Sequence, residues 1–285
     1  MRLAGVGDSV VDRYWDLGTM FPGGQALNVA VYAQRFGIDA AYLGVVGDDV
    51  AGRHILGAMQ AEGIDIPRVR VVPGRSGFAE VALVEGNRVF LGGGPGVSEF
   101  RLSADDLAYL QGFDLIHSSE SSYLEDQLGL LAGVAPLSFD FSERRDPAYV
   151  EPLLAHVTIA EFSLSDMDDA EAKEWLERIH GFGPRLILAT RGAAGALLYD
   201  GRELWRQAAV ETELIDTLGA GDAFIARFLV GVLRDEPVGE TLAAAAIAAA
   251  ETCRGYGAFG HGTAAFPPLS SGSGHDVVST TPAVG

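Results

Sequence analysis

Short apolar runs alternate with helical patterns along most of this chain, and this alternation limits its fold more than any other feature. A short apolar run between turn signals is typical of a buried strand, whereas apolar residues three and four apart indicate an amphipathic helix. The predicted strands are Leu3–Val6, Tyr42–Val46, Leu115–Ser118, Leu137–Phe141, Val157–Ala160, Leu186–Thr190 and Ala196–Tyr199, and the helices between them include Ala26–Phe36, Arg53–Glu62 and Tyr123–Ala132. Such alternation predicts a doubly wound α/β fold whose mostly parallel sheet carries helices on both faces.

This fold class also predicts where a ligand binds. Ligands of open parallel sheets lie beyond the carboxyl ends of the strands. Asp8, Asp140 and Thr190 stand at such ends in the predicted sheet. We therefore expect these three residues near a binding site.

A different pattern interrupts the alternation between about residues 67 and 96. Val69–Val72, Phe78–Val84 and Arg88–Leu91 indicate antiparallel strands, and residues 85–87 (Glu-Gly-Asn) suit a hairpin turn. Together with the segment Tyr14–Phe21 they predict a small β lid, drawn from about residues 12–22 and 67–96. An inserted β element of this kind is either a lid over an active site or a surface for a homodimer, and the sequence leaves both open.

Composition limits the partners and the compartment. The net charge of −19 argues against nucleic acid or an anionic membrane as the main partner, because both need a basic face. The single cysteine, Cys253, cannot form an internal disulfide, and no signal peptide or membrane span is visible, so we expect a cytoplasmic protein. One domain over residues 1–266 accounts for the apolar content, and the Pro-, Ser-, Gly- and Thr-rich residues 267–285 predict a disordered tail.

The strongest motif is a glycine-rich turn at residues 216–224, which read Asp-Thr-Leu-Gly-Ala-Gly-Asp-Ala-Phe. Gly219 and Gly221 let the chain fold tightly, and the apolar residues that follow recur at helical spacing. The turn therefore predicts the N-terminus of a buried helix, where free N–H groups and the helix dipole attract anions. Asp222, in the first helical turn, is then either a reactive carboxylate or an ordinary stabilising helix start.

Weaker signals lie elsewhere. Gly24 and Gln25 precede a helical pattern in which Asn28 places an amide among apolar neighbours, and this favours a ligand contact over a flexible helix start. Asp12 belongs either to a ligand site or to a solvated loop. The G-x-G-x-x-G string at residues 255–260 follows a helix instead of a strand, which rejects a dinucleotide role, and the six histidines show no metal-ligand spacing.

In this order the segments resemble the ribokinase-like (PfkB) family of carbohydrate kinases over about residues 3–262. The resemblance implies the ribokinase-like fold, with ATP as the phosphoryl donor. It implies that Asp222 removes a proton from a sugar hydroxyl, and that the amides of Gly219, Ala220 and Gly221 form an anion hole. It further implies two groups of contacts: the sugar with Asp12, Gly24, Gln25, Asn28 and Glu120, and the nucleotide with Thr190, Gly192, Gly195 and Gly257.

One departure from the family concerns its N-x-x-E motif, which organises magnesium. The matching residues 160–166 read Ala-Glu-Phe-Ser-Leu-Ser-Asp, without asparagine. We still expect Mg²⁺ dependence, with Glu161 or Asp166 as the substitute contact, since a hard cation needs oxygen ligands. Potassium activation occurs in some family members and stays open here.

The expected activity is ATP-dependent phosphorylation of a sugar or fructosamine hydroxyl at a primary O6. Within the family, the chain most resembles kinases of fructosamines of the fructoselysine type, and this resemblance favours such a substrate. The segments that carry it are residues 21–24 (Phe-Pro-Gly-Gly), 28–32 (Asn-Val-Ala-Val-Tyr), 87–90 (Asn-Arg-Val-Phe) and 139–142 (Phe-Asp-Phe-Ser). Two alternatives remain: a kinase for another sugar or a nucleoside, and a sugar or nucleotide sensor that has lost turnover.

Overall fold

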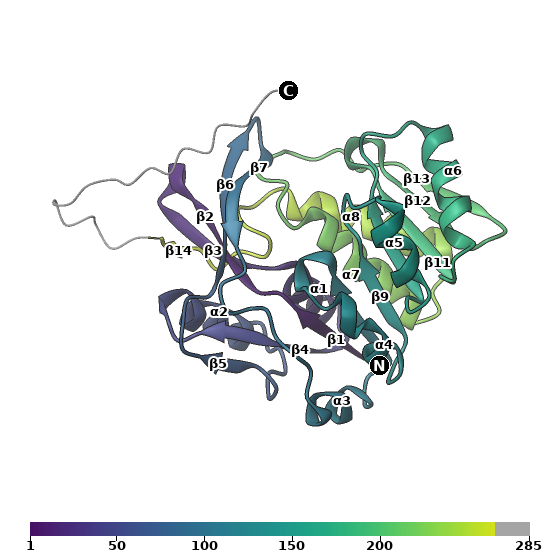
Figure 1. Ribbon diagram of the computed structural model, residues 1–285. Coiled ribbons are helices and arrows are strands. Elements are labelled where there is room, and N and C mark those ends of the chain that lie inside the picture. The colour runs from purple at the N-terminus through teal and green to yellow at the C-terminus, as the bar shows by residue number, and fades with distance from the viewer. Residues whose placement is uncertain (266–285) are drawn as a thin grey trace, which may run out of the picture.

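Two sheets organise the chain in the computed structural model, which describes residues 1–265 (Figure 1). The larger sheet has the strand order β13-β12-β11-β10-β9-β8-β1-β4-β5. Its strands are β1 (Arg2–Gly7), β4 (Asp39–Gly47), β5 (Arg70–Val72), β8 (Leu115–Ser119), β9 (Leu137–Asp140), β10 (Ile159–Ser163), β11 (Leu186–Thr190), β12 (Ala196–Tyr199) and β13 (Leu204–Gln207). All neighbours from β5 to β11 pair in parallel, whereas β12 and β13 are antiparallel additions. The mostly parallel sheet is as predicted.

Helices cover both faces of this sheet. They are α1 (Gln25–Arg35), α2 (Val50–Ala61), α3 (Ala104–Leu110), α4 (Leu128–Ala132), α5 (Pro147–Leu154), α6 (Asp169–His180), α7 (Ala220–Leu233) and α8 (Val238–Thr252). One hydrophobic cluster joins α1, α2, α7 and α8 to one face, and a second joins α3 to α6 to the other. Successive residues of β1 alternate between them, with Leu3 in the first cluster and Ala4 in the second, as the pleat requires. This arrangement confirms the doubly wound fold.

The predicted helix Tyr123–Ala132 is shorter than expected. Only Leu128–Ala132 is α-helical, and short 3₁₀ turns occupy Glu120–Ser122 and Glu125–Gln127. Tyr123 has φ 55°, a left-handed conformation that an α-helix cannot contain. The apolar spacing correctly indicated a helix that ends at Ala132. The backbone turns at Tyr123, however, and the α-helix begins only at Leu128.

The smaller sheet has the order β14-β3-β2-β6-β7. Its strands are β2 (Val10–Tyr14), β3 (Thr19–Gly23), β6 (Gly77–Val84), β7 (Asn87–Gly94) and β14 (Thr263–Ala264). The hairpin β6–β7 turns at Glu85 and Gly86, whose positive φ angles of 52° and 78° suit a tight hairpin. The prediction that the segment Tyr14–Phe21 joins these strands in one small β element is confirmed, because β3 pairs with β2 and β2 pairs in parallel with β6.

The prediction for Val69–Val72 was wrong. This strand, β5, pairs in parallel with β4 in the larger sheet and is no part of the lid. The helix α2 lies between β4 and β5 in sequence, so the three form a β–α–β unit that returns the chain to the same sheet. A three-residue strand shows no periodicity that identifies its partner.

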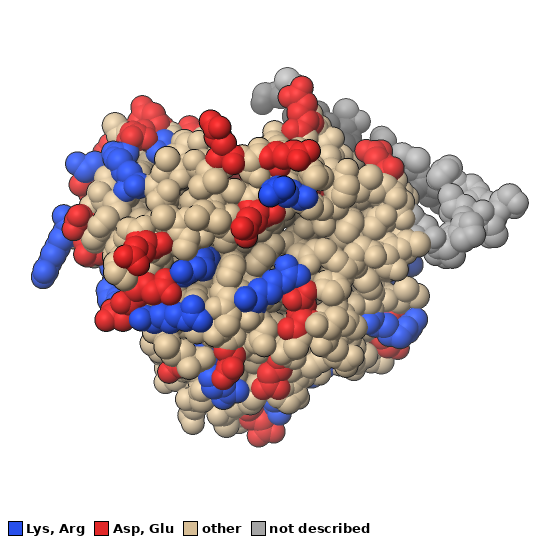
Figure 2. All heavy atoms as spheres, turned by 180° about the vertical axis from the view of Figure 1, so that it is seen from behind, with Lys and Arg blue, Asp and Glu red and all other residues tan. Residues whose placement is uncertain are grey.

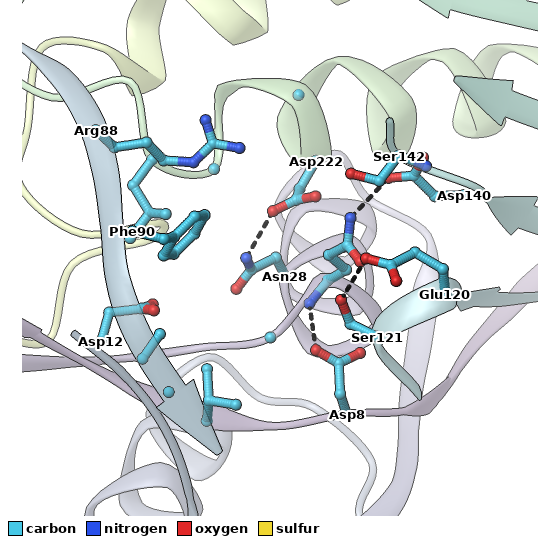
Figure 3. A pocket seen from close by; sticks show the side chains of 18 of the residues that line it. Asp8, Asp12, Asn28, Arg88, Phe90, Glu120, Ser121, Asp140, Ser142 and Asp222 are labelled. Carbon is cyan, nitrogen blue, oxygen red and sulfur yellow. Dashed lines mark hydrogen bonds between the residues drawn. The ribbon is translucent and has the colours of Figure 1, made fainter. Parts of the chain in front are cut away.

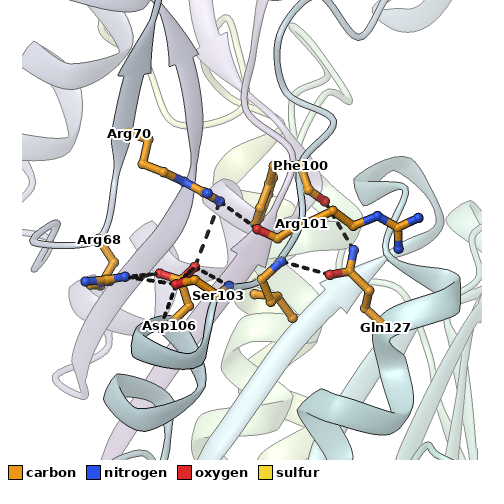
Figure 4. Close-up of polar contacts among 8 residues, drawn as sticks. Arg68, Arg70, Phe100, Arg101, Ser103, Asp106 and Gln127 are labelled. Atoms are coloured by element: carbon orange, nitrogen blue, oxygen red, sulfur yellow. Dashed lines mark hydrogen bonds and ion pairs between the residues drawn. The ribbon is translucent and has the colours of Figure 1, made fainter.

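Polar contacts tie together the two chain segments that lead into and out of the β6–β7 hairpin (Figure 4). Arg68 Nε donates to buried Asp106 at 2.8 Å, and Arg70 donates to the carbonyl of Arg101 at 3.2 Å. Gln127 holds the same returning segment through the Phe100 carbonyl and the Leu102 amide. The base of the hairpin is therefore fixed to the elements that form and cover the larger sheet.

Three further expectations concern the surface and the chain end. Figure 2 shows basic and acidic side chains interspersed over one face, which gives nucleic acid no basic surface on that side. Within residues 1–265, no helix combines the length and the apolarity that a membrane crossing requires. The predicted tail, residues 267–285, lies outside the described residues.

Candidate active site

A cavity of about 810 Å³ lies at the carboxyl edge of the larger sheet (Figure 3). The last residue of a parallel strand, or the next one, reaches its wall from β1, β8, β9, β10 and β11: Asp8, Glu120, Asp140, Ser163 and Thr190. Helices α1 and α7 contribute Gln25, Asn28 and Asp222, and the β6–β7 hairpin contributes Phe78, Arg88 and Phe90. Asp8, Asp140 and Thr190 thus lie at the site, as the fold class predicted.

The glycine-rich turn forms the start of α7. Gly219 is its N-cap with φ 79°, and a Cβ there would lie 2.6 Å from the Ala258 Cα, so only glycine fits. Gly221 lines the cavity, and no atom lies within 4 Å of the position of an added Cβ. Within the described chain, the amides of Gly219, Gly221 and Asp222 donate to no protein acceptor. These free N–H groups suit an anion.

The amide of Ala220 is not free, although it was expected to form part of the anion hole. Its N–H donates to the Thr217 carbonyl at 3.2 Å and closes the turn that precedes the helix. The amide of Asp222 takes its place among the free donors. Sequence spacing could not show this, because the conformation of the turn decides which amide is used internally.

Asp222 and Asn28 meet across the interface between α7 and α1. Asn28 Nδ2 donates to Asp222 Oδ2 at 2.6 Å. Burial raises the pKa of Asp222 to about 6, while the Asn28 hydrogen bond and the positive charge of Arg88 oppose this rise. Asp222 is therefore mostly ionised at neutral pH, with a basicity suited to proton abstraction.

Two aspartates near the start of the chain differ in their surroundings. Asp8 accepts hydrogen bonds from the amides of Gln25 and Ala26 and from the Ser122 hydroxyl, so it stabilises the N-terminus of α1. Asp12 lies on the cavity wall, and no protein donor within residues 1–265 bonds to its carboxylate. Burial, and then the charge of Asp222, raise the pKa of Asp12 to about 8. Its position suits hydrogen bonds to a polyhydroxylated ligand.

Glu120 and Asp140 stand at the ends of neighbouring strands. Glu120 lies 3.5 Å from Arg144 Nε, and Asp140 accepts from Gln25 Nε2 at 2.9 Å and from the Ser142 amide at 2.7 Å. Burial raises the pKa of Asp140 to about 7, against the effect of the Ser142 amide.

Sequence reasoning placed Arg88 and Phe90 in a predicted lid strand but not among the site residues, whereas β7 brings both to the cavity wall. Thr217 connects this strand to the glycine-rich turn, since its amide donates to the Gly86 carbonyl at 3.1 Å and its hydroxyl accepts from the Arg88 amide at 3.0 Å. The Arg88 guanidinium lies 5.2 Å from the Phe90 ring centroid and forms no ion pair within the described chain. One sequence signal could have identified them: Arg88 and Phe90 are two residues apart on a predicted hairpin strand, which places both side chains on the same face.

Several predicted residues lie away from the cavity wall. Gly192 and Gly195 shape the turn between β11 and β12 with φ of 54° and 87°. The Gly257 amide donates to Asp216 Oδ2 at 2.9 Å, and its backbone packs on the Phe21 ring. Thr190 alone of the predicted nucleotide contacts lines the cavity itself.

Glu161 does not lie on the cavity wall. Its side chain is buried within the sheet and accepts a hydrogen bond from the Ser138 hydroxyl at 2.6 Å, and burial raises its pKa well above the usual value. Asp166, the other candidate, is bound by both terminal nitrogens of Arg145. Within residues 1–265, no group of three or more His, Cys, Asp or Glu could hold a metal ion.

Comparisons with known proteins agree with this geometry. The chain matches the pfkB family of carbohydrate kinases over residues 17–260. It is 42% identical over 267 residues to fructosamine kinase FrlD of Bacillus subtilis, covering 92% of this chain and 94% of that protein. It is 34% identical over 259 residues to fructoselysine 6-kinase of Escherichia coli, covering 90% of this chain and 99% of that protein.

A solved structure shares the fold. The putative ribokinase II of E. coli, in complex with ATP and Mg²⁺, aligns with a TM-score of 0.77 over 90% of this chain and 94% of that one. Its sequence identity is 20%, so the likeness concerns the ribokinase-like fold alone.

Proposed function

The chain belongs to the pfkB family of carbohydrate kinases, and we propose that it transfers the γ-phosphoryl group of ATP to the O6 hydroxyl of a fructosamine of the fructoselysine type. The observation that carries this proposal is the Asp222–Asn28 pair beside the free amides of Gly219 and Gly221. A carboxylate suited to act as a base and amides suited to bind an anion line the same cavity, which supports the proposal. We further propose that the reaction takes place in the cytoplasm, where ATP is available as the phosphoryl donor.

Asp222 acts as the general base of this reaction. It takes the proton of the O6 hydroxyl as that oxygen bonds to the γ-phosphorus, and the bond from phosphorus to the departing ADP oxygen breaks. The free amides at the start of α7 face the oxygens of the transferred group and stabilise their charge. Asn28 orients Asp222, and Asp12 holds sugar hydroxyls.

Mg²⁺ belongs to the proposal through the family, but the residues at the cavity form no cage for it. Glu161 and Asp166 both have internal partners, as described above. Magnesium in kinases is bound by substrate phosphates, water and one or two carboxylates, so we assign the ion chiefly to the phosphates of ATP and to neither Glu161 nor Asp166. The ATP-consumption assay, run with and without K⁺, tests potassium dependence.

An ATP-consumption assay over a panel of acceptors tests the proposal. The panel contains fructoselysine, fructose, ribose and a nucleoside, and the product is identified by mass and by the position of the phosphate. We expect fructoselysine to give the highest kcat/KM, with phosphate on O6. A nucleoside or a neutral sugar as the preferred acceptor would replace the substrate assignment, and ligand binding without phosphate transfer would favour a sensor.

A further inference from the structure

The cavity wall carries more carboxylates than cations. Its acidic residues are Asp8, Asp12, Glu120, Asp140, Glu143 and Asp222, and its basic residues are Arg88 and Arg144. Asp8 stabilises the start of α1, and Asp222 is the proposed base. Glu120 Oε2 lies 3.5 Å from Nε of the exposed Arg144, whereas its Oε1 accepts only from the Ser121 hydroxyl within the described chain and contacts no cation there. The proposed reaction gives Asp140 no role, and Asp140 forms no ion pair within residues 1–265.

Asp140 is held in one orientation by neutral groups. Gln25 Nε2 donates to its Oδ2, and the Ser142 amide donates to its Oδ1. Each oxygen keeps a free lone pair, although the residue is buried. Buried carboxylates are normally paired with a cation, because desolvation of an unpaired charge is costly. An ammonium group would stabilise the ionised form and oppose the rise in pKa that burial causes.

A second carboxylate lies beside Asp140. Ser119 of β8 is the register partner of Asp140 in β9, so Glu120, the next residue, emerges next to it. Figure 3 shows Glu120 and Asp140 on one side of Asp222, with Asp12 and Arg88 on the other. Two carboxylates on one side of the base match the two N–H groups of a protonated secondary amine.

Asn28 independently indicates a ligand with donor groups. Its side chain is 3% exposed and lines the cavity, and its Oδ1 has no hydrogen-bond partner within the described residues. A buried amide oxygen without a partner is unfavourable. The cavity therefore provides acceptors for hydroxyl and ammonium groups together.

We propose that Asp140, with Glu120 beside it, binds the protonated amine of the acceptor and so selects a fructosamine over a neutral hexose. This inference rests on the proposed function. A fructosamine carries its amine on C1, at the opposite end of the sugar from O6. With O6 at Asp222, the amine reaches the wall formed by the ends of β8 and β9.

The test compares wild type with Asp140→Asn on fructoselysine and on fructose. Asparagine keeps an acceptor for the Ser142 amide but removes the charge. We expect KM for fructoselysine to rise about 10- to 100-fold, the equivalent of one lost charge-assisted hydrogen bond, with kcat within a few-fold of wild type. Preference over fructose should fall by a similar factor. Asp146→Asn is the matched control, because it removes a charge outside the cavity and asparagine also caps α5.

The two levels of the argument fail separately. If wild type phosphorylates no fructosamine, the proposed function is wrong. If wild type does so and Asp140→Asn lowers kcat without raising KM, or raises only the Mg²⁺ requirement, Asp140 does not read the amine and the proposed function stands. Thermal unfolding checks the fold of the variant, and Glu120→Gln gives the same comparison if Asp140→Asn does not fold. Calorimetric titration of fructoselysine without ATP should show the same loss of affinity.

Discussion

Burial raises the pKa of Asp222 to about 6, and at the residue scale this value determines the expected pH dependence. A carboxylate accepts a proton only when it is ionised, so kcat at saturating acceptor should fall as the pH drops through about 6. Arg88 lowers the pKa of Asp222, and Arg88→Gln should therefore move this acid limb to higher pH. The pH profile of kcat at saturating acceptor, recorded for both enzymes, measures the shift. A limb that moves to lower pH would contradict the electrostatic link.

Asp222→Asn tests the base directly. Asparagine preserves the shape of the side chain but cannot accept the proton, so kcat should fall about 10²- to 10⁴-fold while acceptor affinity stays close to that of wild type. Steady-state kinetics and calorimetric titration separate the two effects. Asp235→Asn, at the other end of α7, is the control, since asparagine tolerates its left-handed backbone. Equal losses in both variants would assign the defect to the helix.

At the scale of elements, the start of α7 depends on a backbone conformation. Gly219→Ala places a Cβ 2.6 Å from the Ala258 Cα at φ 79°, and the strain alone costs about 1–2 kcal/mol. We expect a lower melting temperature and a loss of kcat, because the free amides shift. Gly255→Ala is the matched control, since no atom lies within 4 Å of its added Cβ. Full activity of Gly219→Ala would mean that the turn does not position the phosphoryl group.

The elements also show how far sequence patterns can be read. Apolar periodicity located the strands that end at Asp8, Asp140 and Thr190, because side-chain alternation is a local property. The same patterns assigned Val69–Val72 to the lid, whereas β5 pairs with β4. Strand pairing is made between distant segments, and a short strand carries no mark of its partner.

At the scale of the whole molecule, the lid has two faces. Arg88 and Phe90 line the cavity, and Val89 between them points to the other face of the strand. Leu91 lies at a bulge opposite Glu80 and Val81; both Val89 and Leu91 are exposed, and neither lines the cavity. The position of β7 at the cavity supports the interpretation of the smaller sheet as a lid. The exposed outer face of β7 is where the predicted homodimer would form.

Leu91→Asp tests that homodimer. A dimer formed through this face should dissociate, because the substitution would bury a charge in an apolar contact. Sedimentation velocity compares wild type with Leu91→Asp and with Val50→Asp, a substitution of an equally exposed apolar residue on α2 (64% against 63%). A wild-type protein that sediments with the mass of a single chain would remove the homodimer prediction.

The sequence alone determined the α/β class and the helix that begins at the glycine-rich turn with Asp222 in its first turn, because periodicity, glycine spacing and helix termini are local in the chain. The tertiary structure decided which side chains share one cavity with that turn. Arg88 of β7 and Asp140 of β9 line this cavity. Glu161 is buried in the sheet instead, and the Ala220 amide is hydrogen-bonded within the turn. These outcomes depend on pairing and burial between segments far apart in sequence, which no local pattern encodes.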